Sequence, residues 1–261
     1  MTAALAGRHV LVTGAGSGIG TAIAQALAAA GANVSLAGRR RAPLEAVAAR
    51  LGAESSFVVD GFDVTDEQAI ARGLKAARDR FGPVTILVNN AGEAPSAPFA
   101  QTSMEMWAHV IGVDLTGVFK VTQAALPDLL GHGAGARIVN VASTAGLVGY
   151  AYVAAYCAAK HGVVGLTRAL ALELAKSGVT VNAVCPGFTD TPLLQGAIDT
   201  IVAKTGRGES EARATLTRAN PQGRLVMPAE VADTVLWLAS PGASSINGQA
   251  IAVAGGEVMT G

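Results

Sequence analysis

Two side chains that could together perform acid–base chemistry lie four positions apart in the segment AAYCAAKHG, residues 154–162. On a helix this spacing puts Tyr156 and Lys160 on one face, with Cβ atoms about 5–6 Å apart. A phenol with a reference pKa of about 10 is a poor base at neutral pH, but an ammonium group within about 4–6 Å lowers that pKa by about 1–3 units. The pair predicts a tyrosine that exchanges protons with a substrate, although the spacing alone is common by chance.

A serine precedes this expected helix. Ser143 stands at the end of an expected strand, where its hydroxyl could hydrogen-bond a substrate oxygen and hold it against the phenol of Tyr156. With Lys160, these residues form the predicted catalytic group.

A glycine-rich turn, TGAGSGIG at 13–20, ends the first expected strand and begins the first expected helix. Glycines let the backbone approach a pyrophosphate, and the helix N-terminus offers N–H groups and the positive end of its dipole. The spacing is G-x-x-x-G-x-G, not the general G-x-G-x-x-G, and a turn that binds nothing is the alternative. The candidate contacts are Gly14, Ser17, Gly18, Ile19 and Gly20.

The end of the second expected strand, LAGRR, bears on the choice of dinucleotide. An acid about 20 residues past the glycines holds a ribose 2′-hydroxyl, whereas an arginine accommodates a 2′-phosphate. Here Gly38 stands where the acid would be, and Arg39 follows. The missing carboxylate and the cationic fork favour NADP(H) over NAD(H), which stays possible. Alternatively, residues 39–41 form only a solvated start to the next helix.

Two further strand ends could hold the rest of a dinucleotide. After the third expected strand, Asp63 could accept from an adenine amino group while Val64 packs on the ring. The motif NNAG follows the fourth strand: Asn90 could tie neighbouring strand ends together, while Ala91 and Gly92 leave room for a flat ring. Simple turn chemistry would also explain the asparagines.

The elements that must position these residues alternate along the chain. Continuous apolar strands separated by helices predict a single-domain α/β fold over 1–261, a Rossmann-like doubly wound parallel sheet of about seven strands with helices on both faces. The expected strands cover 9–14, 33–38, 56–62, 85–92, 137–143, 180–187 and 249–256. The expected helices cover 18–30, 43–51, 66–81, 103–130, 150–177 and 228–240.

The candidate residues all follow expected strands. The glycine turn, Arg39, Asp63, NNAG and Ser143 share this placement with Pro186 and Gly187 at the end of the sixth strand. Open α/β sheets bind ligands at that edge. Residues 188–227 are predicted to be a substrate lid or loop, because so long a connection in a compact domain is usually a binding loop; an ordinary amphipathic helix pair fits the pattern equally.

Bulk properties exclude several classes of function. Nineteen basic and nineteen acidic residues balance, so no nucleic acid and no membrane surface is expected as a partner. No signal peptide or bilayer-spanning run is expected, and two cysteines imply no disulfide framework, which predicts a cytoplasmic protein. The histidines lack ligand-like spacing, so no metal is expected. The apolar helix at 150–177 predicts a subunit interface.

TGAGSGIG, NNAG, Ser143, YCAAK and PGFTDT occur in this order over essentially the whole chain, and together they resemble the short-chain dehydrogenase/reductase family. The resemblance implies a Rossmann enzyme, usually a homotetramer, in which Tyr156 exchanges a proton with a carbonyl or alcohol oxygen while hydride passes to or from nicotinamide. Lys160 would bind the nicotinamide ribose and lower the tyrosine pKa. The backbone at Thr189 and the hydroxyl of Thr191 would contact the carboxamide.

One position departs from the family pattern. Where the family usually has asparagine in a segment like NLTGVF, this chain has DLTGVF with Asp114. In the family that residue helps to hold a water in a proton relay to the lysine. Asp114 could accept from that water or pair with Lys160 and weaken its effect on Tyr156, which predicts reduced or pH-shifted activity; alternatively it is an acceptable near-isostere.

The run from Tyr156 to PGFTDTP looks most like ketoacyl-thioester reductases, including those of polyketide synthesis. The leading expectation is therefore a reductase of 3-oxoacyl thioesters. Coenzyme A esters, free ketones, cyclic or small secondary alcohols and polyols stay open. A hypothesis of another class is an NADP(H)-binding regulator without turnover.

Overall fold

Seven short strands of mainly β-branched and aliphatic residues form one parallel sheet in the order β3-β2-β1-β4-β5-β6-β7. The computed structural model describes residues 4–259, except the side chain of Lys204. Strand β1 is central, and its Val10 pairs with Val34 on one side and Ile86 on the other. The strands are β1 (His9–Thr13), β2 (Asn33–Ala37), β3 (Ser56–Val59), β4 (Ile86–Asn89), β5 (Arg137–Val141), β6 (Thr180–Pro186) and β7 (Ala250–Val253).

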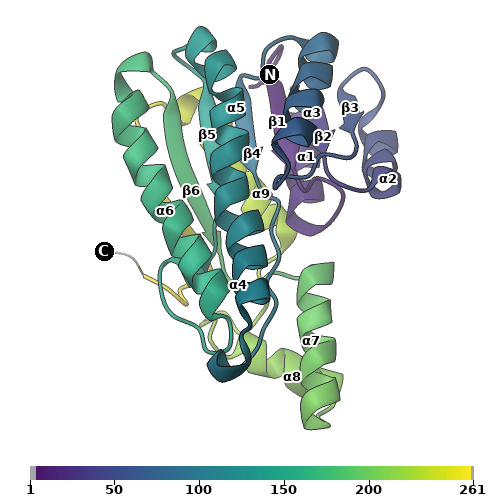
Figure 1. Ribbon diagram of the computed structural model, residues 1–261. Coiled ribbons are helices and arrows are strands. Elements are labelled where there is room, and N and C mark those ends of the chain that lie inside the picture. Colours follow the sequence, from purple (N-terminus) through teal and green to yellow (C-terminus); the bar gives the residue numbers. More distant parts are fainter. Residues whose placement is uncertain (1–3, 260–261) are drawn as a thin grey trace.

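Helices cover both faces of this sheet, because parallel strands need crossover connections that return along one face or the other. One layer contains α1 (Gly18–Ala29), α2 (Arg41–Leu51) and α9 (Pro228–Ala239). The other contains α3 (Glu67–Phe81), α5 (Gly117–His132) and α6 (Ala154–Leu174). Figure 1 shows α5 and α6 in front of the sheet. The predicted doubly wound Rossmann-like fold is confirmed.

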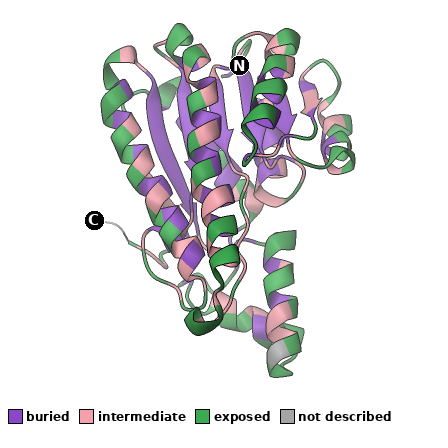
Figure 2. Cartoon of the chain, in the orientation of Figure 1, coloured by how far each residue is buried: buried purple, intermediate pink, exposed green. Residues whose placement is uncertain are grey.

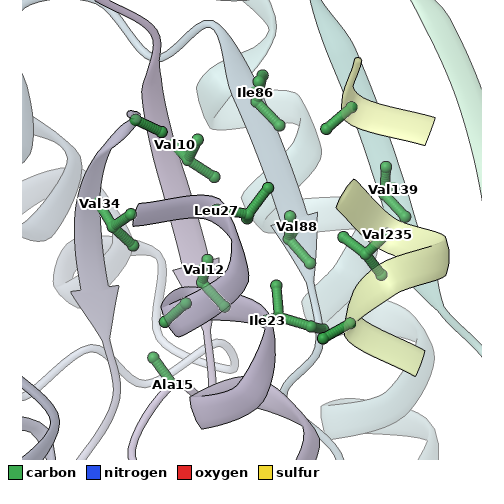
Figure 3. Packing of buried hydrophobic residues seen from close by; sticks show 14 of the residues in the cluster. Val10, Val12, Ala15, Ile23, Leu27, Val34, Ile86, Val88, Val139 and Val235 are labelled. Atoms are coloured by element: carbon green, nitrogen blue, oxygen red, sulfur yellow. The ribbon is translucent and has the colours of Figure 1, made fainter. Parts of the chain in front are cut away.

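The core lies between the sheet and these helices. Alternate residues of each strand point to opposite layers: Val10 and Val12 contact the α1 and α9 layer, and Leu11 between them contacts the α3 and α5 layer. Figure 3 shows side chains of α1 and α9, such as Leu27 and Val235, meeting those of β1, β2, β4 and β5. Strands β1, β4, β5 and β6 are buried along their whole length, the edge strand β7 is only partly buried, and exposed residues lie on the outer helix surfaces (Figure 2). The sheet is therefore a rigid platform for the loops at its edge.

The segment expected as one helix over 103–130 is divided. Helix α4 (Met104–Ile111) runs into a π-helical turn at Gly112–Thr116, which then continues as α5. A wider turn changes the direction of its side chains, and such turns often occur at functional sites. This turn contains Asp114, which is fully buried. The expected helix at 150–177 begins later, at Ala154, after Tyr152 takes a left-handed conformation (φ 70°).

Residues 188–227 contain a helix pair, which was one of the two expectations for this segment. Helices α7 (Pro192–Thr205) and α8 (Glu209–Thr217) project beyond the sheet edge (Figure 1). Leu194 and Ile198 are buried against Ala212 of α8, so part of the apolar surface packs within the pair. Lys204, a basic residue of this segment, has a side chain outside the described part. Among the described residues, no helix is long and apolar enough to cross a membrane.

Candidate active site

The carboxyl ends of β1 to β6 bring the predicted residues to one edge of the sheet. Because all seven strands are parallel, the loops that follow them leave on the same side. Residues from the loops after β1 and β4 pack together: a Cβ atom added to Gly14 would lie 2.9 Å from the Cα atom of Ala91. The loops after β1 and β4 are therefore in direct contact.

The glycine turn after β1 forms a cradle that side chains would fill. Gly14 has φ +65° and Gly18 has φ +51°, conformations that favour glycine. A Cβ atom at Gly20 would overlap the carbonyl oxygen of Gly14 and lie 2.5 Å from Nδ2 of Asn90. Helix α1 begins here at Gly18, and the Ser17 side chain makes no capping hydrogen bond to any described residue. The N–H groups of Ile19 and its neighbours fit a pyrophosphate.

A hydrogen-bond network joins the ends of β1 and β4. Asn90 Nδ2 donates to the carbonyl oxygens of Thr13, at 3.0 Å, and Gly14, at 3.3 Å. The Thr13 hydroxyl accepts from the backbone N–H groups of Asn90 and Ala91, at 2.9 and 3.0 Å. Asn90 thus ties neighbouring strand ends together, as the sequence predicted. The part played by Thr13 was missed, although it stands directly before the glycine turn.

Arg39 follows β2 at this edge, and its guanidinium contacts a carboxylate. Its Nη2 atom lies 2.7 Å from Oε1 of Glu93, the residue after NNAG. The other oxygen of Glu93 lies 2.9 Å from Nε2 of His109, on α4. The His109 hydrogen bond and the charge of Arg39 hold the pKa of Glu93 below its usual value. No protein partner of Arg39 was predicted, because Glu93 and His109 are remote from it in the chain.

Asp63 and Val64, after β3, have separate local roles. Oδ1 of Asp63 accepts from the N–H and the hydroxyl of Thr65, at 2.8 and 2.7 Å. The backbone hydrogen bond from Thr65 lowers the pKa of Asp63 despite partial burial, and the charge of Arg39 lowers it further. Val64 is buried against Gly117, where an added Cβ atom would lie 2.7 Å from a methyl carbon of the valine. Contact of either residue with an adenine ring stays a prediction.

Tyr156 and Lys160 share one side of α6, as their spacing predicted. The ammonium nitrogen of Lys160 lies 5.4 Å from the centre of the Tyr156 ring. Tyr156 is half-buried against Val110 and Ala159. Ser143, at the end of β5, lies within reach of the phenol, and its oxygen accepts from the N–H of Ala145 at 3.1 Å. The three predicted catalytic side chains therefore meet at the edge.

Lys160 is held by two oxygen atoms below the phenol. Its ammonium nitrogen lies 3.2 Å from Oδ1 of Asp114 and donates to the carbonyl oxygen of Val141 at 3.1 Å. The backbone N–H of Glu93 also points at this carboxylate, 3.2 Å from Oδ2. A Cβ atom at Gly92 would lie 2.6 Å from Oδ1, so glycine is required beside the pair. The expected pairing of Asp114 with Lys160 is confirmed.

Burial and charge act in opposite directions on these groups. Burial raises the pKa of Tyr156 above its usual value, the charge of Lys160 opposes this, and Asp114 adds to it. The sequence predicted a lowered value; the difference arises because it left out burial and the charge of Asp114. Burial also raises the pKa of Asp114. For Lys160 burial acts downward, but the Asp114 carboxylate and Tyr156 outweigh it and raise its pKa.

We take the Asp114–Lys160 pair as ionised although burial raises the pKa of the carboxyl. Two donors, the Lys160 ammonium and the N–H of Glu93, point at the Asp114 carboxylate, and both favour its charged form. The raised pKa of Lys160 keeps its proton on the amine. A cation therefore stays beside Tyr156.

The loop after β6 borders the glycine cradle. Pro186 ends β6, and the N–H of Gly187 donates to Val253 O of β7 at 3.0 Å. Thr191 caps the N-terminus of α7: its hydroxyl accepts from the N–H of Leu194 at 3.3 Å. A Cβ atom at Gly18 would lie 3.2 Å from Cγ2 of Thr191, so this loop contacts the glycine turn.

The hydroxyl of Thr189, in the same loop, donates to the carbonyl oxygen of Gly187 at 2.9 Å, and the residue is buried. At the start of α7 there is an open hollow of about 610 Å³ lined by Asp190, Thr191, Pro192, Gln195, Gly196 and Asp199. The loop after β6 is therefore held by hydrogen bonds at Gly187 and Thr189 and borders an open hollow at the start of α7.

The whole arrangement matches one family of enzymes. Residues 8–202 match the model of the short chain dehydrogenases. The chain belongs to the short-chain dehydrogenase family. It is accordingly an oxidoreductase that acts on CH–OH or carbonyl groups.

Relatives of this short-chain dehydrogenase have different named activities. This chain is 43% identical to a Streptomyces coelicolor protein that carries the name of a ketoacyl reductase, and the match covers 94% of this chain and 95% of the relative. It is 41% identical to cis-4-hydroxycyclohexanecarboxylate dehydrogenase of Sinomonas cyclohexanicum, over 98% of both chains. A variant of actinorhodin polyketide ketoreductase, solved with NADPH, superposes with a TM-score of 0.92 at 40% identity, covering 98% of this chain and 99% of that one.

A second tyrosine lies near Ser143 in the short-chain dehydrogenase fold, and sequence analysis did not single it out. The hydroxyl of Tyr150 donates to the carboxylate of Glu257 and lies 2.9 Å from the hydroxyl of Thr144. Burial and the Glu257 contact raise the pKa of Tyr150. The Glu257 carboxylate disfavours the phenolate of Tyr150, whereas the Lys160 ammonium favours the phenolate of Tyr156. Tyr156 is therefore the better candidate for proton exchange.

Proposed function

We propose that this enzyme reduces a carbonyl group, or oxidises the matching secondary alcohol, with Tyr156 as the acid/base. The observation that carries this proposal is the Lys160 ammonium 5.4 Å from the Tyr156 ring, on the sheet edge that also holds the glycine cradle. A nicotinamide cofactor bound at this edge would supply or accept the hydride. Tyr156 gives a proton to the substrate oxygen in reduction and takes it back in oxidation.

Each neighbour of Tyr156 has a proposed task. Ser143 binds the substrate oxygen and keeps it against the phenol. Lys160 lowers the free energy of the phenolate, which opposes the effect of burial. Asp114 fixes the position of the lysine, because the π-helical turn aims its carboxylate at the buried ammonium. The carboxylate also reduces the net positive charge near Tyr156, which makes the phenol a weaker acid.

The residues at the edge fit a dinucleotide, and we infer NADP(H) as the preferred form, with NAD(H) possible. Gly14, Ser17, Gly18, Ile19 and Gly20 would hold the pyrophosphate, because their cradle excludes any side chain. Arg39 would bind a 2′-phosphate. The related ketoreductase solved with NADPH supports this choice. The adenine, the nicotinamide ribose and the carboxamide would be held by Asp63, Val64, Asn90, Ala91, Gly92, Tyr156, Lys160, Pro186, Gly187, Thr189 and Thr191.

A 3-oxoacyl thioester and its 3-hydroxy product are the proposed substrate pair. The relative that carries the name of a ketoacyl reductase and the polyketide ketoreductase structure support this class. A cyclic secondary alcohol is the second candidate, because a relative at 41% identity acts on a hydroxycyclohexane carboxylate by name. Residues 188–227 would form the lid over the substrate, because α7 and α8 project beyond the sheet edge and the loop before α7 contacts the glycine turn.

We also infer a homotetramer in the cytoplasm. The outer face of α6 exposes small residues at Ala158, Gly165 and Ala169 together with polar side chains, and Leu172 on it is 82% exposed. Phe119 and Leu130, on α5 in the same layer, are also exposed. Faces of this kind on two helices suit contact with a second copy of the chain. Both cysteines are free, which agrees with a reducing compartment.

The test is an absorbance assay of nicotinamide oxidation over a panel of substrates, each with NADPH and NADH. We expect turnover of acetoacetyl thioester with NADPH above that of cyclic ketones, small ketones and polyols. Preference for cyclic ketones would favour the second candidate. No turnover of any carbonyl or alcohol, with intact dinucleotide binding, would instead support a regulator and overturn the proposal.

A further inference from the structure

The ion pair between Arg39 and Glu93 crosses the edge of the sheet where a dinucleotide would lie. Arg39 follows β2 and Glu93 follows β4, and β1 lies between these strands. At about 4.8 Å between neighbouring strands, the pair spans about 10 Å over the end of β1. The end of β1 carries the glycine cradle, so the 2.7 Å contact joins the loops on either side of that cradle.

Glu93 is held in place, whereas Arg39 has no second ion pair or side-chain hydrogen bond among the described residues. The Glu93 carboxylate binds His109 at 2.9 Å, and its backbone N–H points at buried Asp114. The Arg39 side chain is 60% exposed and that of Glu93 is 32% exposed. If the contact opens, the arginine is therefore the partner that moves.

Arg39 could bind either the Glu93 carboxylate or the 2′-phosphate of a dinucleotide, and the two groups bind a guanidinium in the same way. A guanidinium binds carboxylates and phosphates through the same fork of N–H donors. Gly38 leaves no carboxylate at the end of β2 itself, next to the arginine. Glu93 supplies one from two strands away, and Asp63 is close enough to Arg39 for their charges to interact.

We propose that Glu93 is a cofactor-specificity residue: its carboxylate competes with the 2′-phosphate of NADP(H) for the Arg39 guanidinium and so reduces the preference for NADP(H) over NAD(H). The inference rests on the proposed dinucleotide function. A ribose 2′-hydroxyl does not need the arginine, so the competition falls on the phosphorylated cofactor alone.

The expected effect is moderate, because the pair is partly exposed. An exposed ion pair contributes at most about 1 kcal/mol, which corresponds to about fivefold in affinity. Removing the charge of Glu93 also removes its repulsion of a phosphate. The Glu93→Gln variant should therefore bind a nucleotide that carries a 2′-phosphate at least about fivefold more tightly than the wild type does. Its affinity for the same nucleotide without the 2′-phosphate should not change.

The experiment is calorimetric titration of the full-length protein with adenosine 2′,5′-bisphosphate and with adenosine 5′-monophosphate, which differ only in the 2′-phosphate. The variants are Glu93→Gln, Arg39→Gln and the double substitution. We expect Glu93→Gln to lower the Kd of the bisphosphate alone. We expect Arg39→Gln to raise the Kd of the bisphosphate and to leave that of the monophosphate unchanged. In the double variant, the gain in bisphosphate affinity caused by Glu93→Gln should be smaller than it is with Arg39 present.

Glu45→Gln is the matched control. Glu45 forms an exposed ion pair of the same length, 2.7 Å, with Arg41 on α2, and it does not contact Arg39. If Glu45→Gln raises the affinity for the bisphosphate as much as Glu93→Gln does, the effect is one of general charge and the proposal is overturned. The proposal is also overturned if the Kd values of Glu93→Gln for the two nucleotides are unchanged or change by the same factor. A wild-type protein that binds neither nucleotide would instead refute the dinucleotide function itself.

Discussion

The Lys160 ammonium nitrogen lies 3.2 Å from Oδ1 of Asp114, and both side chains are buried. The lysine is therefore shared between a carboxylate on one side and the Tyr156 phenol on the other. Each negative partner weakens the effect of the lysine on the other, because the same positive charge stabilises both. The acidity of Tyr156 is thus set by three side chains.

Replacing Asp114 by asparagine should move the pH dependence of turnover to lower pH. Asp114 raises the pKa of Tyr156, so its loss lowers that pKa. Reduction uses the protonated phenol and would fail at lower pH than in the wild type. Alcohol oxidation uses the phenolate and would rise at lower pH. The measurement is turnover against pH in both directions.

Asparagine keeps an oxygen acceptor for Lys160 and for the N–H of Glu93, so Asp114→Asn should stay folded, which a thermal unfolding curve checks. Identical pH profiles for the variant and the wild type would mean that the carboxylate does not influence the phenol.

Replacing Gly20 by alanine should damage the dinucleotide cradle. The added methyl group would overlap the carbonyl oxygen of Gly14 and press on Asn90. Such overpacking lowers stability by about 1–3 kcal/mol, and we expect at least about a tenfold loss of NADPH affinity by fluorescence titration, as 1.4 kcal/mol corresponds to tenfold. Gly131→Ala is the control: it lies in α5 with open space around it and should leave binding unchanged. Normal affinity in Gly20→Ala would show that the cradle does not hold the cofactor.

Glu230 should stabilise the fold in a pH-dependent way. Its carboxylate binds Arg224 through both oxygens, at 2.7 Å each, and accepts from the N–H of Met227 at the start of α9. The Arg224 contact lowers the pKa of Glu230 from 4.5 to about 2. A lowered folded-state pKa gives stability that is present above about pH 4.5 and is lost as the pH falls towards about 2.

Glu230→Gln should therefore lower the free energy of unfolding by about 1 kcal/mol at neutral pH, an amount limited by solvent screening. The difference from wild type should shrink as the pH falls below about 4.5, measured by urea unfolding at several pH values. Glu54→Gln, at an exposed position without an ion pair among the described residues, is the control. A difference that stays constant with pH would contradict this assignment.

Leu172→Glu should reduce the size of the assembly. The residue is 82% exposed in the single chain, and a charge there would have to be buried in a subunit contact. Light scattering coupled to size exclusion should show a tetramer for the wild type and a smaller species for the variant. Met104→Glu, which changes an exposed residue on α4, should keep the wild-type mass. An unchanged mass for Leu172→Glu would place the contact elsewhere.

Local patterns predicted most of the fold. Apolar runs such as HVLVTG and the alternation of strands and helices led to the parallel sheet, and the spacing of Tyr156 and Lys160 led to a shared helix face. The division of 103–130 was not predicted, because the π-helical turn at Gly112–Thr116 keeps the apolar pattern of a continuous helix. Contacts between distant loops were also beyond local pattern.

The Arg39–Glu93 pair shows this limit most clearly. The two residues are 54 positions apart, and only the strand order brings them together. The direction of the Tyr156 pKa shift likewise depends on burial, which a spacing rule does not contain. The placement of the candidate residues at strand ends was therefore predictable. The charged partners that change their pKa values were not.

The central claim is that Tyr156 exchanges the proton, and Tyr156→Phe tests it most directly. The variant keeps the ring and its packing and loses only the hydroxyl. Turnover with NADPH and NADPH binding by fluorescence titration are measured on the same preparation. We expect turnover to fall by about 10²–10⁴-fold with the Kd for NADPH within about twofold of wild type. A variant that binds NADPH and retains most of its turnover would contradict the claim.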